Sequence, residues 1–242
     1  MRRTWITVRL WPLITLAGCV TAVTQPTLRS PRWAVEQESE DVGQTADAAR
    51  GAGQDDAVGD LEPHHSQTLP GGLACLIQLQ ELGIAHRHLG PLRGVDTPVR
   101  VTGPVGGITY RPLGRHGLVA DCRLVLALHR AAPYLQNLGI TELAFSGAYS
   151  YRMMPSGRPS RHALGLAIDV HQVQVDAGPL LVDRDFELGV APEQACRRGA
   201  PVLNRMACLL KQWGLFDRVL TPDFDRAHYN HLHLAILALR RR

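Results

Sequence analysis

The feature that most limits how this chain can fold is the composition of its first quarter. Between Glu36 and Glu62 the sequence is rich in Asp, Glu, Gln, Ala and Gly and has few large apolar side chains. Such a segment cannot bury enough apolar surface to offset the entropy lost on ordering. We therefore expect residues 19–68 to form a disordered linker and assign the folded domain to residues 69–242.

The residues before this linker have the pattern of an export signal. Arg2 and Arg3 precede an apolar stretch over residues 6–17, which is shorter than the roughly 20 residues of a membrane-spanning helix. The Leu-Ala-Gly-Cys sequence at residues 16–19 resembles the bacterial lipobox, in which a signal peptidase cleaves before a cysteine that receives lipid. We expect a lipoprotein signal peptide over residues 1–18 and lipidation of Cys19, with a plain signal peptide as the alternative. In Gram-negative lipoproteins, an aspartate directly after the lipidated cysteine favours retention in the inner membrane. Val20 stands at that position here, which favours the periplasmic side of the outer membrane.

Four further cysteines indicate disulfides in an exported chain, because an even number of thiols can pair in an oxidising compartment. They are Cys75, Cys122, Cys196 and Cys208. The sequence allows three pairings and does not choose among them; we favour Cys75–Cys122 and Cys196–Cys208. Buried free thiols are the alternative, and a cysteine zinc site is disfavoured because no C-x-x-C occurs.

Apolar periodicity predicts an α+β domain. Helical spacing predicts a helix with Leu73, Leu76, Ile77 and Leu82 on one face, and two more over residues 118–138 and 201–213, each followed by a glycine. Strands are expected at residues 99–102, 107–110, 143–146, 166–175, 179–182 and 231–237. Helices packed on a small, mostly antiparallel sheet satisfy this pattern.

The charge distribution excludes one class of partner. The formal net charge is +4, and much of it comes from Arg2, Arg3 and Arg9 and from residues 240–242. The remainder is nearly balanced, so we expect no nucleic-acid partner. We expect a monomer.

Two segments carry the residues suited to metal chemistry. His231 and His233 are two apart on an expected strand and so point to one face. Asp169 lies between apolar neighbours, where a bare carboxylate is costly to bury without a partner. Two imidazoles and one carboxylate suit a zinc ion that keeps a fourth position for water and lowers its pKa to about 7. With 11 histidines in the chain, a His-x-His pair alone would be weak evidence.

The spacing around these residues resembles a known group. Residues 160–169 read Ser-x-His-x-x-Gly-x-Ala-x-Asp, and a His-x-His follows at residues 231–233. This resembles the lysostaphin, D-alanyl-D-alanine carboxypeptidase and hedgehog group of zinc proteins. The resemblance implies a single zinc site on the sheet with His162, Asp169 and His233 as ligands. Cys75 and the stretches 147–152, 195–196 and 220–224 also resemble the extensin-like C-terminal domain family, over residues 70–235.

The resemblance also implies roles for neighbouring residues. Arg152 would polarise the scissile carbonyl and stabilise the developing oxyanion, and Ser160 would hold the loop that carries His162. Asn230 stands where carboxypeptidases of the group place a glutamate as general base. Endopeptidases of the group have histidines there, and His228 and His231 both fit that pattern. We favour His231 as the base, because it shares an expected strand face with His233, and keep His228 in reserve.

These features predict a zinc-dependent peptidase that cleaves peptide stems or cross-links of peptidoglycan as an endopeptidase or carboxypeptidase, held at the membrane by its lipid. The main alternative is a wall-binding lipoprotein that keeps the fold without hydrolysis, which Asn230 favours. A zinc amidase or another hydrolase is a third possibility. We expect His171 to line the groove outside the site.

Overall fold

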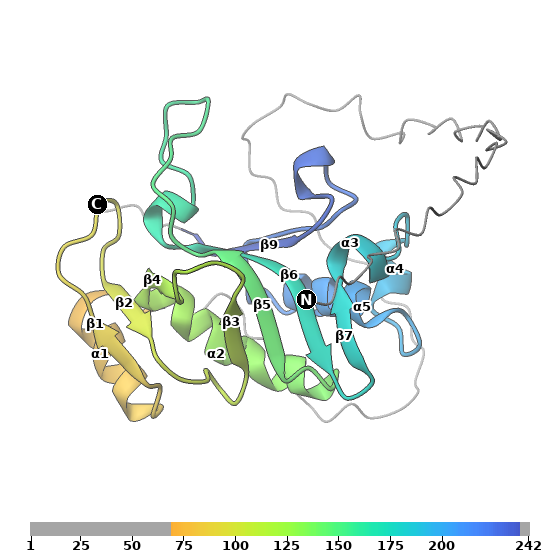
Figure 1. Cartoon of the computed structure of the whole chain (residues 1–242), viewed down its shortest axis with the longest axis horizontal. Helices are drawn as coiled ribbons and strands as arrows, with labels where there is room; N and C mark the ends of the chain where they lie inside the picture. Colours follow the sequence, from red (N-terminus) through yellow and green to blue (C-terminus); the bar gives the residue numbers. More distant parts are fainter. Residues whose placement is uncertain (1–68, 238–242) are drawn as a thin grey trace, which may run out of the picture. The chain divides into compact units, whose positions relative to one another are not determined.

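A nine-residue strand lies at the centre of the larger of two sheets in the computed structural model, which describes residues 69–237 (Figure 1). This strand, β6 (Ala167–Val175), pairs antiparallel with β5 (Glu142–Gly147) along one edge. Along the other edge, its first half pairs with β9 (Leu232–Ala235) and its second half with β7 (Gly178–Leu181). Its position with partners on both edges explains why Ile168, Val170 and Val173 are fully buried.

The remaining strands complete two sheets. β3 (Thr109–Pro112) pairs parallel with β5, and β8 (Arg218–Leu220) pairs antiparallel with β9, so the larger sheet has the order β3-β5-β6-β9-β8 with β7 beside β6. A three-stranded antiparallel sheet has the order β1-β2-β4 and consists of β1 (His86–His88), β2 (Pro98–Val101) and β4 (Val119–Asp121). The α+β prediction is confirmed, but with two sheets and one parallel pair in place of a single small sheet.

Three helices of eight or more residues pack around the sheets: α1 (Gly72–Glu81), α2 (Cys122–Asn137) and α5 (Val202–Gln212). In Figure 1, α2 and α5 lie behind the larger sheet, and the two helices contact each other. The core between them contains the buried residues Leu128, Phe145 and Met206. Short helices complete the chain: α3 (Val182–Asp185), α4 (Pro192–Ala195) and the 3-10 turns η1 (His162–Leu164) and η2 (Arg226–His228). None of the helices described is long and apolar enough to cross a membrane.

The structure corrects three details of the predicted elements. Residues 119–121 form β4, so the helix expected from residue 118 begins at Cys122, where Asp121 caps it by accepting a hydrogen bond from Arg123 N. The core face of α1 consists of Cys75 and Leu79, whereas Leu73 and Ile77 of the expected face are exposed. The strand expected over residues 179–182 is β7, which ends at Leu181, and α3 begins at Val182.

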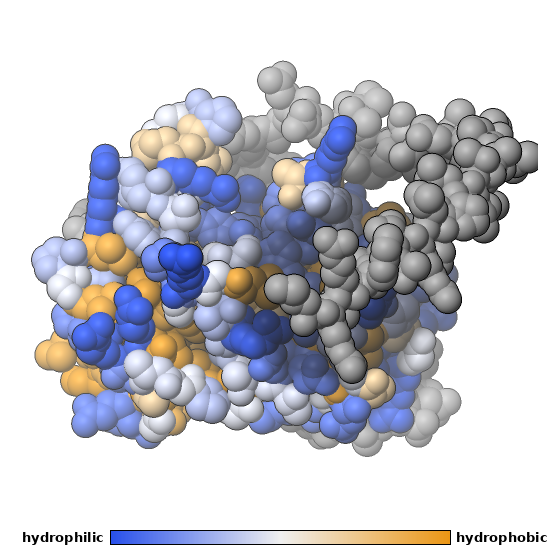
Figure 2. Space-filling model, in the orientation of Figure 1, coloured by the Kyte–Doolittle hydropathy of each residue, from blue (hydrophilic) through white to orange (hydrophobic). Residues whose placement is uncertain are grey.

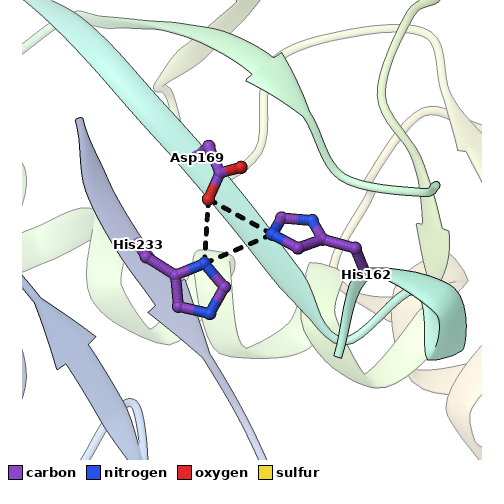
Figure 3. A group of neighbouring side chains, drawn as sticks. All are labelled: His162, Asp169 and His233. Atoms are coloured by element: carbon purple, nitrogen blue, oxygen red, sulfur yellow. Dashed lines mark hydrogen bonds and ion pairs between the residues drawn. The ribbon is translucent and has the colours of Figure 1, made fainter. Parts of the chain in front are cut away.

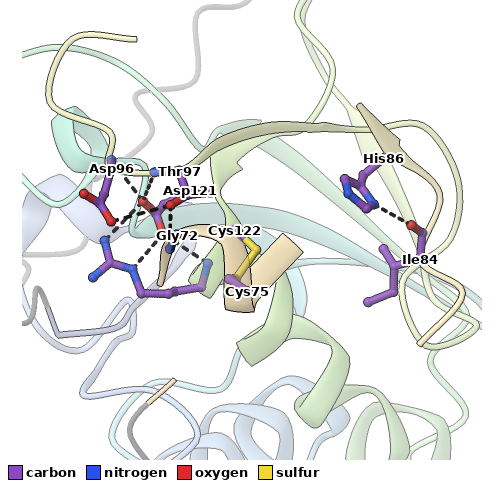
Figure 4. Close-up of a disulfide and its surroundings, with 9 residues drawn as sticks. Gly72, Cys75, Ile84, His86, Asp96, Thr97, Asp121 and Cys122 are labelled. Atoms are coloured by element: carbon purple, nitrogen blue, oxygen red, sulfur yellow. Dashed lines mark hydrogen bonds and ion pairs between the residues drawn. A yellow bond between two sulfur atoms is a disulfide. The ribbon is translucent and has the colours of Figure 1, made fainter. Parts of the chain in front are cut away.

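Asp121 is the centre of a buried polar network near the first disulfide (Figure 4). Its carboxylate accepts hydrogen bonds from Asp96 N, Thr97 N and Arg123 N, and it forms an ion pair with the Arg123 guanidinium at 2.8 Å. Such a pair is stable when buried because the carboxylate oxygens have several hydrogen-bond donors. The network therefore joins the start of α2 to the loop that precedes β2.

Two disulfides join helices. Cys75 of α1 is bonded to Cys122 at the first position of α2, and Cys196, directly after α4, is bonded to Cys208 of α5. These are the two pairs that we favoured from the sequence. The expected export signal, Cys19 and the linker to residue 68 lie outside the described residues.

Candidate metal centre

Three side chains from separate elements meet at one point (Figure 3). Asp169 lies on β6 directly opposite His233 on β9, because these two residues are register partners in the sheet. His162 reaches the same point from η1, which precedes β6. His162, Asp169 and His233 form a group that could hold a metal ion, and no other cluster of His, Cys, Asp and Glu within residues 69–237 does so.

The turn that carries His162 is held by short contacts on both sides. The Ser160 hydroxyl accepts a hydrogen bond from Ala163 N at 3.1 Å, which fixes the start of η1. Gly165 ends the turn with a φ of 66°, a left-handed conformation that side chains other than glycine rarely adopt. A Cβ atom at Gly165 would lie 2.6 Å from Asp121 N, so the glycine also permits close contact with β4.

The distances within the group are also those expected between ligand atoms around one metal ion. Asp169 Oδ1 lies 2.8 Å from His233 Nδ1 and 3.2 Å from His162 Nε2, and the two nitrogens lie 3.2 Å apart. Ligand atoms about 2.0–2.1 Å from a tetrahedral zinc lie roughly 3.3 Å apart, close to what is found here. The group could therefore hold a metal ion.

The environment favours the charge states that metal ligands need. Burial alone would raise the pKa of Asp169, but hydrogen bonds from His162 and His233 outweigh it and hold that pKa well below its usual range. Burial lowers the pKa of His233 in spite of the opposing effect of Asp169. An ionised carboxylate and a neutral imidazole are the forms that bind metals.

Three further histidines surround this group. His231 Nε2 lies 3.6 Å from Asp169 Oδ1, although His231 precedes β9 by one residue. Its Nδ1 lies 3.0 Å from Asn230 Oδ1, and burial lowers its pKa to about 4. The rings of His228 and His171 lie 5.1 Å and 5.2 Å from the His231 ring. The two candidate bases are thus both beside the group, together with His171.

Two contacts at this site were missed by the sequence reasoning. Asp225 Oδ1 lies 2.6 Å from His228 Nδ1; an Asp-x-x-His pattern at a helix start is the signal that could have identified it. His171 Nε2 lies 2.8 Å from the Ser146 hydroxyl. No local pattern predicts the second contact, because it joins neighbouring strands.

Arg152 lies beside the segment that carries His162. Ser160 N donates to Arg152 O at 3.0 Å, and Ser150 N donates to His162 O at 3.2 Å, so the two segments run together. The Arg152 side chain is exposed. The backbone of Arg152 thus lies next to the segment that carries His162, and its side chain is exposed.

In Figure 1, two loops project on the same side of the larger sheet, a hairpin over residues 151–161 and the loop over residues 221–231. Met153 and Met154 of the hairpin are exposed, as are Phe224 and Tyr229 of the second loop. Figure 2 shows pale orange surface over the hairpin, next to hydrophilic surface. The two loops therefore present exposed apolar side chains.

Comparisons with known proteins identify the family of the chain. A family model described as extensin-like protein C-terminus matches residues 75–242, which include all three residues of the group. Neither the curated proteins nor the solved structures gave a match. Because the family model covers more than half of the chain, the protein belongs to the extensin-like protein C-terminus family.

Proposed function

We propose that this protein is a zinc-dependent peptidase that acts on the peptide stems or cross-links of peptidoglycan. The observation that carries the proposal is the convergence of one carboxylate oxygen and two imidazole nitrogens within 3.2 Å of one another. Two histidines and one carboxylate form a ligand set typical of catalytic zinc, which keeps one position open. The resemblance of the Ser160–Asp169 segment to the zinc peptidases supports the same reaction.

A bound zinc would act as a Lewis acid that polarises the substrate carbonyl and makes water more acidic. The protein would supply a proton acceptor and a cation. His228 is the better supported acceptor, because its Nδ1 is hydrogen-bonded to a carboxylate, whereas the Nδ1 of His231 is bonded to a neutral amide. Arg152 would place its guanidinium near the oxygen that becomes negative.

The substrate and the location are inferred together. An exported protein tethered by lipid on Cys19 would meet the peptidoglycan from the periplasmic side of the outer membrane. Peptide stems carry both carboxylates and apolar side chains. The exposed Arg152 and the exposed apolar residues Met153 and Tyr229 offer partners for both kinds of group.

A second candidate function has one observation in its favour. Asn230 stands where a carboxylate base is expected in the carboxypeptidases, and its side chain is bonded to His231. An amide cannot accept a proton in this way. The alternative is therefore a wall-binding lipoprotein that retains the metal group without hydrolysis.

Incubation of the purified, zinc-loaded protein with muropeptides, followed by mass spectrometry, tests the proposal. A carboxypeptidase releases one terminal amino acid, and an endopeptidase converts cross-linked dimers into monomers. Release of the intact peptide from the sugar would instead identify an amidase. Binding of muropeptides without products would support the wall-binding alternative. Asp169→Ala should abolish turnover, whereas His116→Ala, at an exposed position, should leave it unchanged.

The same assay distinguishes the two candidate bases. His228→Ala should lower kcat by about 10²–10⁴-fold, the usual contribution of a positioned acid or base, with zinc content unchanged. His231→Ala should cost less. The reverse order would return the role to His231, and loss of zinc in His231→Ala would make His231 a ligand.

A further inference from the structure

We propose that Asp225 is a positioning residue that holds the His228 ring in one orientation and one tautomer, with the hydrogen on Nδ1. The inference rests on the proposed function, in which His228 accepts a proton. It extends that function to a residue outside the metal-binding motif and eight positions before His233.

The contacts of a single oxygen carry the argument. Asp225 Oδ1 lies 2.6 Å from His228 Nδ1, 2.8 Å from Ala227 N and 3.1 Å from His228 N. The two backbone donors belong to η2, so the backbone fixes the position of the oxygen before the ring meets it. A carboxylate oxygen only accepts hydrogen bonds. The ring nitrogen that faces it must therefore carry a hydrogen, and in the neutral ring Nε2 then keeps its lone pair.

Burial and charge agree with this role. The His228 side chain is 17% exposed and the Asp225 side chain 39% exposed, so the contact is partly shielded from water. Burial alone would raise the pKa of Asp225, but the hydrogen bonds from His228 and from the backbone outweigh it and lower that pKa. Asp225 is therefore ionised at neutral pH, and a charge-assisted hydrogen bond holds a ring more firmly than a neutral one.

Neighbouring rings place His228 where this orientation matters. Its centroid lies 5.8 Å from the ring of His233 and 5.1 Å from the ring of His231. The Phe224 ring packs edge-on against the His228 ring, with the centroids 5.5 Å apart. The ring thus contacts both an apolar neighbour and a residue of the candidate metal centre, and the hydrogen bond to Asp225 decides which nitrogen accepts a proton.

Asp225 has a second role as the N-terminal cap of η2, and the variants must separate the two. Asp225→Ser retains a good capping group, but its shorter side chain has no carboxylate for the ring. Asp225→Asn retains an acceptor oxygen for both the cap and the ring and removes only the charge. A role in capping alone predicts that both variants behave like the wild type.

The first measurement does not depend on activity. Nitrogen NMR of histidine side chains should show His228 as the Nδ1–H tautomer in the wild type and in Asp225→Asn, and as a mixture in Asp225→Ser. His228→Ala identifies the signal. An Nε2–H tautomer in the wild type would overturn the proposal. The tautomer can be measured even if the protein hydrolyses no muropeptide. Failure of the positioning proposal is therefore distinguishable from failure of the proposed function.

The second measurement is steady-state turnover of the muropeptide that the wild type cleaves. Asp225→Ser should lower kcat by about 10–100-fold, as for other residues that orient catalytic groups, with KM and zinc content unchanged. Asp225→Asn should show a smaller decrease and remains informative if the serine variant does not fold. Combining Asp225→Ser with His228→Ala should add no further loss. A kcat within twofold of the wild type in both single variants, or loss of zinc in either, would overturn the proposal.

Discussion

Ser146 and His171 face each other across β5 and β6, with Ser146 Oγ and His171 Nε2 2.8 Å apart. Each is the extra residue of a β-bulge, because the register of the two strands shifts once at each position. The two shifts cancel, so pairing continues on both sides. On β6, Ile168 and Val170 are buried before the bulge, and Val173 and Val175 are buried after it. Asp169 and His171 therefore both point to the opposite side of the strand.

The first prediction concerns this pair. Ser146→Ala should lower the free energy of unfolding by about 0.5–1.5 kcal/mol, the net value of a hydrogen bond. A double-mutant cycle with His171→Ala, measured by urea denaturation, should give a coupling energy of similar size. Effects that add to within about 0.3 kcal/mol would show that the contact does not stabilise the bulges.

The second prediction concerns the metal. The purified protein should bind about one zinc ion per chain, and addition of zinc should raise its melting temperature. His162→Ala, Asp169→Ala and His233→Ala should each lose the ion, because two ligands do not complete the site. Elemental analysis after dialysis checks this, with His116→Ala as the matched control. Full zinc content in His233→Ala would remove His233 from the site.

The third prediction compares two glycines with similar backbone conformations. Gly157 has a φ of 76° and open space around it, whereas at Gly165 a Cβ atom would lie 2.6 Å from Asp121 N. Gly157→Ala should cost about 1 kcal/mol for the left-handed conformation alone. Gly165→Ala should cost about 1–3 kcal/mol more, because its Cβ atom would collide with the backbone of β4. It should also weaken zinc binding by moving His162. Equal stability of the two variants, measured by thermal unfolding, would contradict the steric argument.

The fourth prediction concerns stability at alkaline pH. The Tyr110 hydroxyl is buried and has no hydrogen-bond partner among the described residues, and burial raises its pKa above the ordinary value. The phenolate is therefore disfavoured in the folded state. The free energy of unfolding should not depend on Tyr110 below about pH 10, the pKa of tyrosine in the unfolded chain. It should fall as the pH rises from there towards the higher pKa of Tyr110 in the folded state.

Tyr110→Phe should reduce this alkaline loss by up to about 1.4 kcal/mol per pH unit, the value for one proton, and should not lower stability at neutral pH. Burial also raises the pKa of Tyr134. A double variant with Tyr134→Phe should therefore flatten the curve further. Denaturation from pH 8 to pH 11 checks the result, and a slope equal to that of the wild type in both variants would contradict it.

The fifth prediction concerns the anchor. Cys19→Ser should move the protein from the membrane fraction to the soluble envelope fraction, because the serine cannot form the thioether to the lipid. Fractionation followed by immunoblotting measures the change. A Cys19→Ser protein that stays in the membrane fraction would show that another segment holds it there.

Periodicity predicted the longer elements because each has enough apolar positions to reveal its repeat. The helices over residues 122–137 and 202–212 and the strand over residues 167–175 are examples. The three-residue strands β1 and β8 are too short to show alternation. Val119 and Ala120 were joined to the following helix because they are apolar, although Asp121 after them is a typical N-terminal cap.

The candidate metal ligands could be predicted because the spacing of His162, Asp169 and His233 in the sequence is specific. The residues that hold the neighbouring rings in place could not be predicted, because their contacts depend on tertiary structure. A side chain such as Asp225 looks like an ordinary helix cap until the ring of His228 is seen against it. The pairing of Ser146 with His171 requires the register of two strands, and the sequence of either strand alone does not contain it.

The disulfide between Cys75 and Cys122 determines how the folded part responds to mechanical load. Cys75 lies in the first turn of α1, and Cys122 begins α2, whose side chains fill the core. Tension applied through the chain before Gly72 can unravel three residues of α1 at most before it meets a covalent bond. The load then reaches the first residue of the long helix and the Asp121 network at its start, so the rest of α1 stays folded under a pull from the N-terminal side.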